Sequence, residues 1–308
     1  SRAEAGTGGA VSGNSATTRS TDRRTAQAGL GVRPTTQTDG DEKRDDFAAW
    51  DAELEGEGAG RLYVPGLTFQ ATHAGTLDVR GDSSLVAAAG AGGVDANIVG
   101  NTHVLAGIDD ATHVYSSGDI EVRARTALAR PVGSADADPR VSGTTAGGLT
   151  GADMASTTDV ELVNRVRLGE ATRLETVGEF MTRFTADSSV PPEIAVEAEV
   201  DELALAAAPA LDATGVAAAL RQTVTSDARL RNEVEIADRA DLISVGDLGA
   251  GAYTRADVNV NAAAKASGAA SGMDVVATGN LDLDQKVSLG SDAQLLGMDF
   301  VSFGAGEN

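Results

Sequence analysis

The sequence predicts an all-β fold, a single-stranded parallel β-helix with an extended N-terminal arm, and three observations support this prediction. The core material is aliphatic, because 42% of the residues are hydrophobic but only 3% are aromatic. From residue 61 onward, short segments alternate apolar and polar residues between Gly, Asp, Asn and Ser, as half-buried strands do. A pattern of strand, turn and strand then recurs along the chain, which is typical of a solenoid.

The first 46 residues differ in composition from the rest of the chain. They consist largely of Ser, Thr, Gly, Ala and Arg, with few large apolar residues. Such a segment cannot form a core of its own, so we expect a low-complexity basic arm at 1–46 and a β-helix body at 47–308. The basic residues that we expect to contact a neighbouring subunit are Arg2, Arg19, Arg23, Arg24 and Arg33, against the acidic Glu4 and Asp22.

The strands of the body are predicted from alternation with a period of two. Clear examples are "LDV" at 77–79, "IEVRA" at 120–124, "VNV" at 258–260 and "LDL" at 281–283. Residues 194–222 are ambiguous, because Ile194, Val196, Ala198 and Val200 alternate while the following alanine-rich run would also suit a short helix.

One motif recurs four times. It reads "VLAGIDDATHV" at 104–114, "VRLGEATRL" at 166–174, "VEIADRADL" at 234–242 and "VSLGSDAQL" at 287–295. The copies start 62, 68 and 53 residues apart, which we interpret as two to four turns of a coil of about 20 residues. Three copies continue through Gly and an acidic residue into a further strand, at Gly118-Asp119, Gly178-Glu179 and Gly246-Asp247. A β-sandwich of hairpins is the alternative, but two-residue Asn-Gly and Asp-Gly turns are nearly absent.

The phrases "DDATHVYSSGDIEVRA", "ADRADLISVGDLGA" and "GSDAQLLGMDFVSFGAG" resemble the degenerate repeats of filamentous-haemagglutinin-type exoproteins. The resemblance covers residues 70–308 and lies in the general composition and spacing of the repeats, with no invariant motif. It implies an exported surface protein that forms fibres and serves in adhesion or cell contact.

Composition limits the partners and the chemistry of the chain. Its formal charge of -22 argues against binding nucleic acid, which is itself negative. It has no cysteine, and no apolar run approaches the roughly 20 residues of a membrane span, so we expect no membrane insertion. We expect no cofactor. Since the sequence begins at Ser1, we expect a processed chain or a fragment of a longer one.

The tripeptide Arg80-Gly81-Asp82 matches a receptor-binding motif of adhesive proteins. In a chain this rich in Arg, Gly and Asp the match also arises by chance. We interpret it as a turn between two strands, where Gly allows a positive φ and Asp caps the turn. A receptor-binding loop is the alternative.

Metal and catalytic sites are weakly indicated. "DGDEKRDD" at 39–46 begins like a calcium-binding loop, but Arg44 stands where that loop needs Gly, and Trp50 where it needs Glu. Scattered weak Ca²⁺ binding at the turns remains open, with no residues assigned. We expect exposed or corner positions, and no zinc site, for His73, His103 and His113. An enzyme that degrades polysaccharides would need a groove of carboxylates, for which Asp119, Glu121 and Arg123 are undistinguished candidates.

The sequence therefore predicts a structural subunit, not an enzyme. We expect an extracellular or cell-surface fibre, assembled head to tail through the ends of the β-helix and the N-terminal arm. The alternative is a monomeric adhesin that binds a host or carbohydrate ligand.

Overall fold

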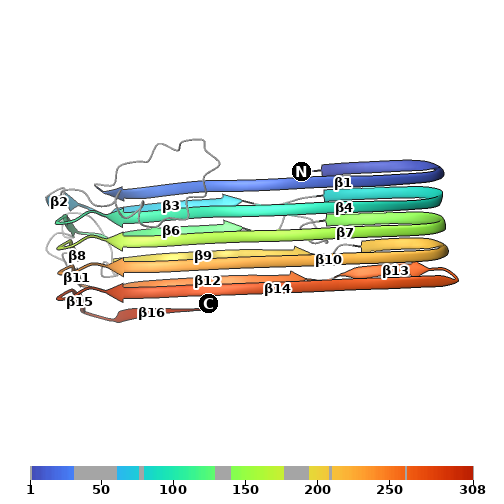
Figure 1. The fold of residues 1–308 in the computed structure, drawn as a ribbon. Coiled ribbons are helices and arrows are strands. Elements are labelled where there is room, and N and C mark those ends of the chain that lie inside the picture. The colour runs from blue at the N-terminus through green and yellow to red at the C-terminus, as the bar shows by residue number, and fades with distance from the viewer. Residues whose placement is uncertain are drawn as a thin grey trace.

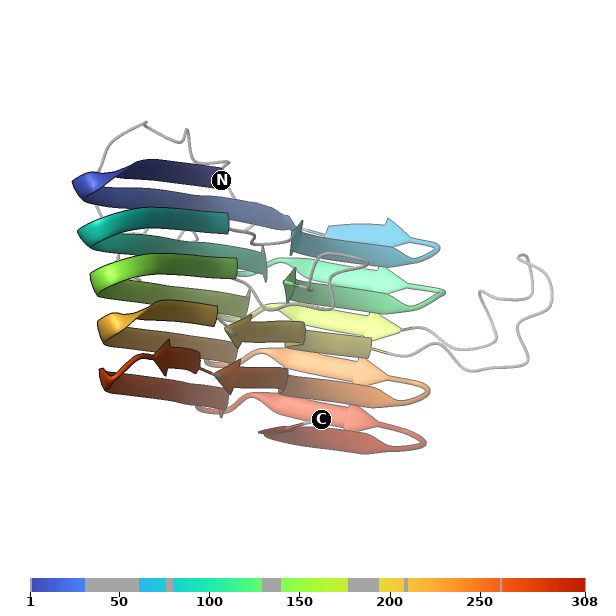
Figure 2. The same ribbon diagram turned by 90° about the vertical axis from the view of Figure 1, so that its right-hand side faces the viewer.

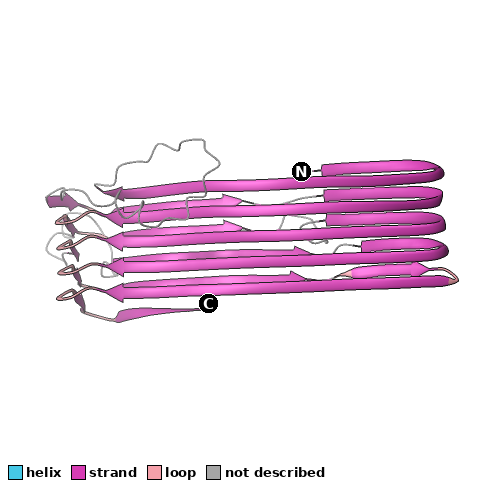
Figure 3. Ribbon diagram, in the orientation of Figure 1, coloured by secondary structure: helices cyan, strands magenta, loops and turns pink. Residues whose placement is uncertain are grey.

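The computed structural model describes residues 2–30, 61–75, 80–128, 140–176, 194–207, 210–260 and 262–307. Every regular element in these ranges is a strand (Figure 3). The strands form three sheets, in which every pair of neighbours is parallel.

Each sheet is built from strands that lie far apart in the sequence. Sheet A contains β1 (Arg2–Leu30), β4 (Arg80–Ile108), β7 (Arg140–Leu168), β10 (Ala210–Ile236), β13 (Ala263–Ser267) and β14 (Ala270–Leu289). Sheet B contains β2 (Arg61–Val64), β5 (His113–Ser116), β8 (Arg173–Thr176), β11 (Asp241–Ser244) and β15 (Gln294–Gly297). Sheet C contains β3 (Leu67–Gly75), β6 (Ile120–Leu128), β9 (Ile194–Ala207), β12 (Leu248–Val260) and β16 (Val301–Glu307).

The chain passes through sheets A, B and C in turn and then repeats the path, so the strands are stacked in layers (Figures 1 and 2). We number the layers in chain order: β1–β3 form layer 1, β4–β6 layer 2, β7–β9 layer 3, β10–β12 layer 4 and β13–β16 layer 5. Layers 1 and 5 are the two ends of the stack (Figure 2).

The long strands of sheet A reverse direction at one end of the molecule, on the right of Figure 1. The residue at the apex of this bend is skipped in the pairing: Ala88, Gly148 and Val216 in layers 2, 3 and 4. Next to the apex the backbone of the preceding layer lies too close for a side chain in layers 3 and 4. A Cβ on Gly147 would lie 1.7 Å from the carbonyl oxygen of Ala87, and one on Gly215 would lie 2.6 Å from that of Gly147. Glycine is therefore required here by the contact between layers.

A tight turn joins sheet A to sheet B at the other end of the molecule. In four layers one residue of this turn has a left-handed backbone without being glycine: Ala111, Ala171, Arg239 and Asp292, with φ of 51°, 54°, 59° and 59°. The amides of the first three each donate to a carbonyl oxygen of the next layer, at 2.8 to 2.9 Å. Stacking of the turns thus compensates a conformation that L-residues disfavour by about 1 kcal/mol or more.

Two clusters of buried side chains form the core. One lies where the second limbs of the sheet A strands meet sheets B and C, with residues such as Ile108, Leu168 and Ile236. The other lies between the two limbs of the bent strands and includes Ile98, Met154 and Leu230. A buried chain of hydrogen bonds runs across the layers: Thr126 donates to Asn164 at 2.6 Å, and Asn164 donates to Asn232 at 2.9 Å. Asn232 in turn donates to the Thr254 hydroxyl at 2.7 Å.

The predicted fold class, a β-helix of short coils with an extended N-terminal arm, is wrong. Arg2–Leu30 are β1, a strand of sheet A that pairs with β4 from Arg2↔Arg80 to Leu30↔Ile108. A layer is also far longer than the predicted coil of about 20 residues, since equivalent positions are Arg80 and Arg140 in layers 2 and 3. Each copy of the repeated motif therefore marks one layer. The remainder of the predicted arm, residues 31–46, lies outside the described residues.

Two smaller predictions also need correction. The described part of the alanine-rich run that suited a helix is strand, in β9 of layer 3 and β10 of layer 4; β9 pairs with β12, and β10 pairs with β7. His73 and His103 were expected at exposed or corner positions but are buried in β3 and β4. The recurring strand, tight turn and strand of the motif are confirmed, as are the Gly-acid turns at 118–119 and 246–247.

Candidate functional site

The apolar core is organised in rows that cross all the layers. A row is a set of residues that are register partners in successive layers of one sheet. In sheet A one such row is Leu30, Ile108, Leu168, Ile236 and Leu289. In sheet C two rows are Leu67, Ile120, Ile194, Leu248 and Val301, and Phe69, Val122, Val196, Ala250 and Phe303. Each row stays apolar from the first layer to the last.

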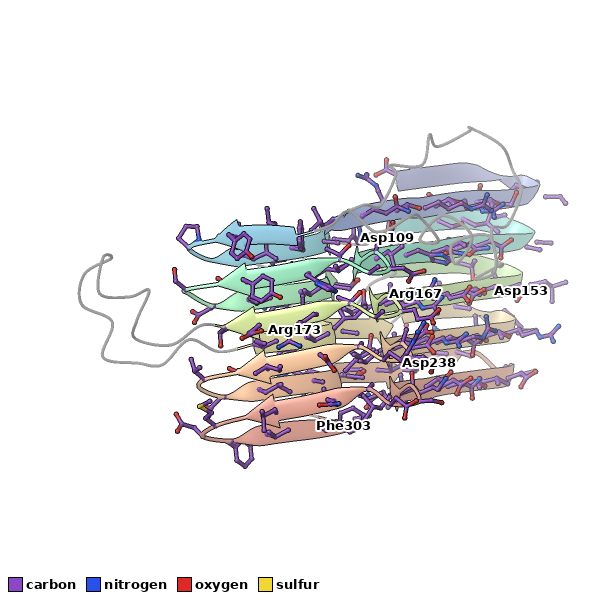
Figure 4. All side chains as sticks on the ribbon, turned by 90° about the vertical axis from the view of Figure 1, so that its left-hand side faces the viewer. Asp109, Asp153, Arg167, Arg173, Asp238 and Phe303 are labelled. Carbon is purple, nitrogen blue, oxygen red and sulfur yellow. The ribbon has the colours of Figure 1, made fainter. Side chains whose placement is uncertain are left out.

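These rows are buried inside the stack and become exposed at layer 5. Ile236 is 1% exposed, and its row partner Leu289 is 44% exposed. Ala250 is fully buried, and its partner Phe303 on β16 is 46% exposed (Figure 4). The cause is the position of layer 5, because no described strand pairs with the far side of β14, β15 or β16. We call this surface the tail face, and the exposed apolar residues of layer 5 include Met273, Leu281, Leu289, Val301 and Phe303.

The opposite end of the stack presents the first members of the same rows. β1, β2 and β3 are the edges of the three sheets at this end among the described strands. Leu30, Leu67 and Phe69 are partly buried and pack against the main core cluster. We call this surface the head face. Head and tail faces therefore carry apolar side chains at equivalent positions of each sheet.

Charged residues form rows of their own, and in several of these rows the register partners in adjacent layers have opposite signs. Arg123 contacts Glu197 at 2.9 Å, Arg173 contacts Asp241 at 3.3 Å, and Arg231 contacts Asp284 at 3.4 Å. The hydrogen bond that Arg173 donates to the Glu175 carboxylate is the main cause that raises the pKa of Arg173 above its ordinary value, so this guanidinium (Figure 4) stays charged. Exposed pairs of this kind add little stability each, but they disfavour other registers.

The described residues of the two end layers have opposite net charge. The described residues of layer 1, 2–30 and 61–75, contain five Arg against Glu4 and Asp22, a net charge of +3. Layer 5, residues 262–307, contains two Lys against six Asp and Glu, a net charge of -4. One row carries this contrast directly, since it runs from Arg23 through Asn101, Glu161 and Arg229 to Asp282. Asp282 is exposed on the tail face, and no described strand occupies the next position of the row.

The arginines of the predicted arm are placed on β1. Arg19, Arg23 and Arg24 are exposed in the second limb of the strand, next to Asn97, Asn101 and Thr102 of β4. Arg2 begins the strand, beside Arg80. Arg33 lies outside the described residues. The structure thus brings four of the five predicted contact residues onto the head edge of sheet A, within the sheet and not on a free arm.

Arg80-Gly81-Asp82 is the start of β4 and not the predicted turn. All three residues pair with β1 on one side and with β7 on the other. Asp82 also accepts a hydrogen bond from the Ser142 hydroxyl of β7. Recognition of the tripeptide by a receptor remains a prediction.

The other candidate sites yield no cluster. Arg123 lies between Glu121 and Glu197, at 3.7 and 2.9 Å, so these charges pair with one another. Among the described residues, no three His, Asp or Glu side chains are grouped in a way that would hold a metal ion. Weak Ca²⁺ binding at the turns remains a prediction. The calcium-like segment 39–46 lies outside the described residues.

The sequence interpretation expected assembly through the two ends of the stack but named none of the apolar residues that form the end faces. Leu289 in the last motif copy, together with Leu281 before it and Phe303 after it, continues the apolar pattern of the preceding layers. The length of a layer could not be read from the sequence. Without it, these residues could not be assigned to the last described layer. A search with models of protein families, with curated proteins and with solved structures found no match for this chain. Within the described ranges, no helix has the length and apolarity needed to span a membrane.

Proposed function

We propose that this chain is the structural subunit of an extracellular fibre or surface layer, in which copies associate head to tail. The tail face of one copy receives the head face of the next. β14, β15 and β16 then pair in parallel with β1, β2 and β3 of the neighbour, and the three sheets continue across the junction. β1 itself makes this contact, in place of the separate arm that the sequence suggested.

The observation that carries the proposal is the exposure of core rows at the tail face. Leu289 and Phe303 occupy positions that are buried in every inner layer, and a neighbour in the same register would cover them with Leu30 and Phe69. Covering each large apolar side chain stabilises the contact by about 1 to 2 kcal/mol. Unpaired backbone groups at the edges of three sheets favour the same partner.

Charge favours a head-to-tail orientation of the two copies over head-to-head or tail-to-tail contact. The described strands of the head layer are net positive and those of the tail layer are net negative, so head and tail strands attract each other, whereas two heads or two tails repel. In the register of the stack, Arg23 of one copy would lie beside Asp282 of the next, as Arg231 lies beside Asp284 inside the molecule. A contact between two different surfaces does not close on itself, so it generates an open filament.

Electron microscopy of the purified chain tests the proposal, together with X-ray diffraction of aligned samples. We expect unbranched filaments with a reflection at about 4.8 Å along the filament axis, from strands stacked perpendicular to that axis. Phe303→Asp places a charge in the centre of the tail face and should prevent filaments. A wild-type chain that stays as single particles at high concentration would refute the proposal and favour the monomeric adhesin.

A further inference from the structure

The bends of sheet A form a second surface, which lies along the side of the stack and not at its ends. It consists of the residues around the apex in each layer, 8–13, 86–91, 146–151, 214–219 and 267–272, and we call it the bend strip. The bends of successive layers lie above one another on the right of Figure 1. The strip therefore runs the full length of the stack.

The bend strip is uncharged in all layers, although the chain as a whole carries a charge of -22. None of its residues is Asp, Glu, Lys or Arg, and most are Gly, Ala, Ser or Thr. Large apolar side chains are nevertheless exposed on it: Val11, Val86, Leu149 and Val216, of which Leu149 is 59% and Val216 67% exposed. Exposure of this kind in several adjacent layers marks a contact surface.

A groove crosses the strip. It has a volume of about 540 Å³ and is lined by residues of four layers, among them Ala89, Leu149, Ala217 and Ala270. Thr150 also lines this groove. Only 6% of this residue is exposed, and its hydroxyl oxygen has no hydrogen-bond partner. A buried hydroxyl without a partner favours a site that another molecule completes.

We infer that the bend strip is a lateral interface, whose partner is the bend strip of a second copy of this chain. Two copies with a charge of -22 repel each other over most of their surface, and this strip is where they can approach without like charges facing. Glycine and alanine allow the two backbones to come close, and Leu149 of each copy fits the groove of the other. The contact is a two-fold one between identical surfaces, unlike the contact between head and tail.

The size of the strip predicts a weak contact between single chains. Five layers at about 4.8 Å give a length of about 24 Å. With a width of about 15 Å, each copy would bury about 350 Å², less than half of the roughly 800 Å² of a standard interface. In a filament the strips add up along the length, so filaments should pair side by side even where single chains barely do.

Cysteine cross-linking tests the inference, because the chain has no cysteine of its own. Leu149 lies in layer 3, the middle layer, which faces layer 3 of the partner whether the two stacks run parallel or antiparallel. Under a mild oxidant, Leu149→Cys should therefore form a disulfide-linked dimer. Glu170→Cys is the control, since Glu170 is in the same layer, is also exposed and lies at the tight turn at the other end.

The result expected is at least a tenfold excess of cross-linked dimer for Leu149→Cys over Glu170→Cys. Adding Val216→Asp, which places like charges on the facing strips, should remove that excess. Equal cross-linking of the two cysteines would overturn the inference. The test does not depend on filaments, because it should give the same result when Asp282→Arg blocks the tail face. Filaments that form but never pair side by side would refute the lateral contact and leave the head-to-tail proposal standing.

Discussion

Asn232→Ala should destabilise the fold more than any other single polar substitution that we consider. Asn232 is fully buried in layer 4 and joins three other polar groups. It accepts a hydrogen bond from the Asn164 amide at 2.9 Å and donates to the Tyr253 carbonyl at 2.5 Å and the Thr254 hydroxyl at 2.7 Å. Alanine removes all three bonds and leaves the partners in the interior.

The magnitude follows from the number of partners left without a bond. A buried polar group that loses its partner costs about 1 to 3 kcal/mol. The Thr254 hydroxyl can rotate toward another acceptor, whereas the Tyr253 carbonyl belongs to the backbone of β12 and the Asn164 side chain is held by the hydrogen bond that it accepts from Thr126. We therefore expect a loss of about 3 to 5 kcal/mol in the free energy of unfolding.

Urea denaturation followed by circular dichroism measures this loss. Asn280→Ala is the control, because Asn280 is likewise an asparagine of a sheet A strand but is exposed on β14 and donates to one side chain, Asp227 at 2.6 Å. The control should cost less than about 1 kcal/mol. In a double-mutant cycle, Asn164→Ala and Asn232→Ala should couple by about 1 kcal/mol or more. A cost for Asn232→Ala no larger than that of the control would refute the idea that buried polar rows hold the layers in register.

Three further substitutions test separate features of the fold and the end face. Gly147→Ala should prevent folding or lower the free energy of unfolding by several kcal/mol, because the new Cβ meets the Ala87 carbonyl oxygen. Thermal melting checks this, and a wild-type melting temperature would contradict the glycine requirement. Ala171→Gly should raise stability by about 0.5 to 1 kcal/mol, since φ is 54° there; a loss in urea denaturation would show that the turn is not strained. Phe303→Asp should leave the melting temperature within a few degrees of wild type while abolishing sedimentable filaments, because Phe303 is already 46% exposed; filaments that persist would exclude the tail face from assembly.

The turns and the aliphatic core could be predicted from the sequence, because both depend on local patterns. The motif copies at 166–174 and 234–242 place Val, Leu and a tight turn at a fixed spacing, and the structure forms the turn at each copy. Alternation likewise marked β6 as a half-buried strand, in which Val122 and Ala124 are buried.

The length of a layer and the role of residues 2–30 could not be predicted from the sequence. The inward-facing residues of β1 include Ala16 and Thr18, which are small or polar and give no hydrophobic alternation. Such residues are buried because the next layer covers them, which is a property of the stack and not of the segment. The bends also contain neither proline nor Asn-Gly, the usual sequence signals of a turn. They contain glycines such as Gly147, and these are needed only because the backbone of the neighbouring layer lies too close for a side chain.

Exchange of the charges on Arg23 and Asp282 tests the head-to-tail contact most directly. Arg23→Asp alone and Asp282→Arg alone place like charges together at the proposed junction, so each should reduce the filament length seen by electron microscopy at low salt by at least tenfold. The double variant restores an opposite pair in the reversed order, and we expect filaments of wild-type length. Single variants that assemble normally, or a double variant that assembles no better than either single one, would contradict the account.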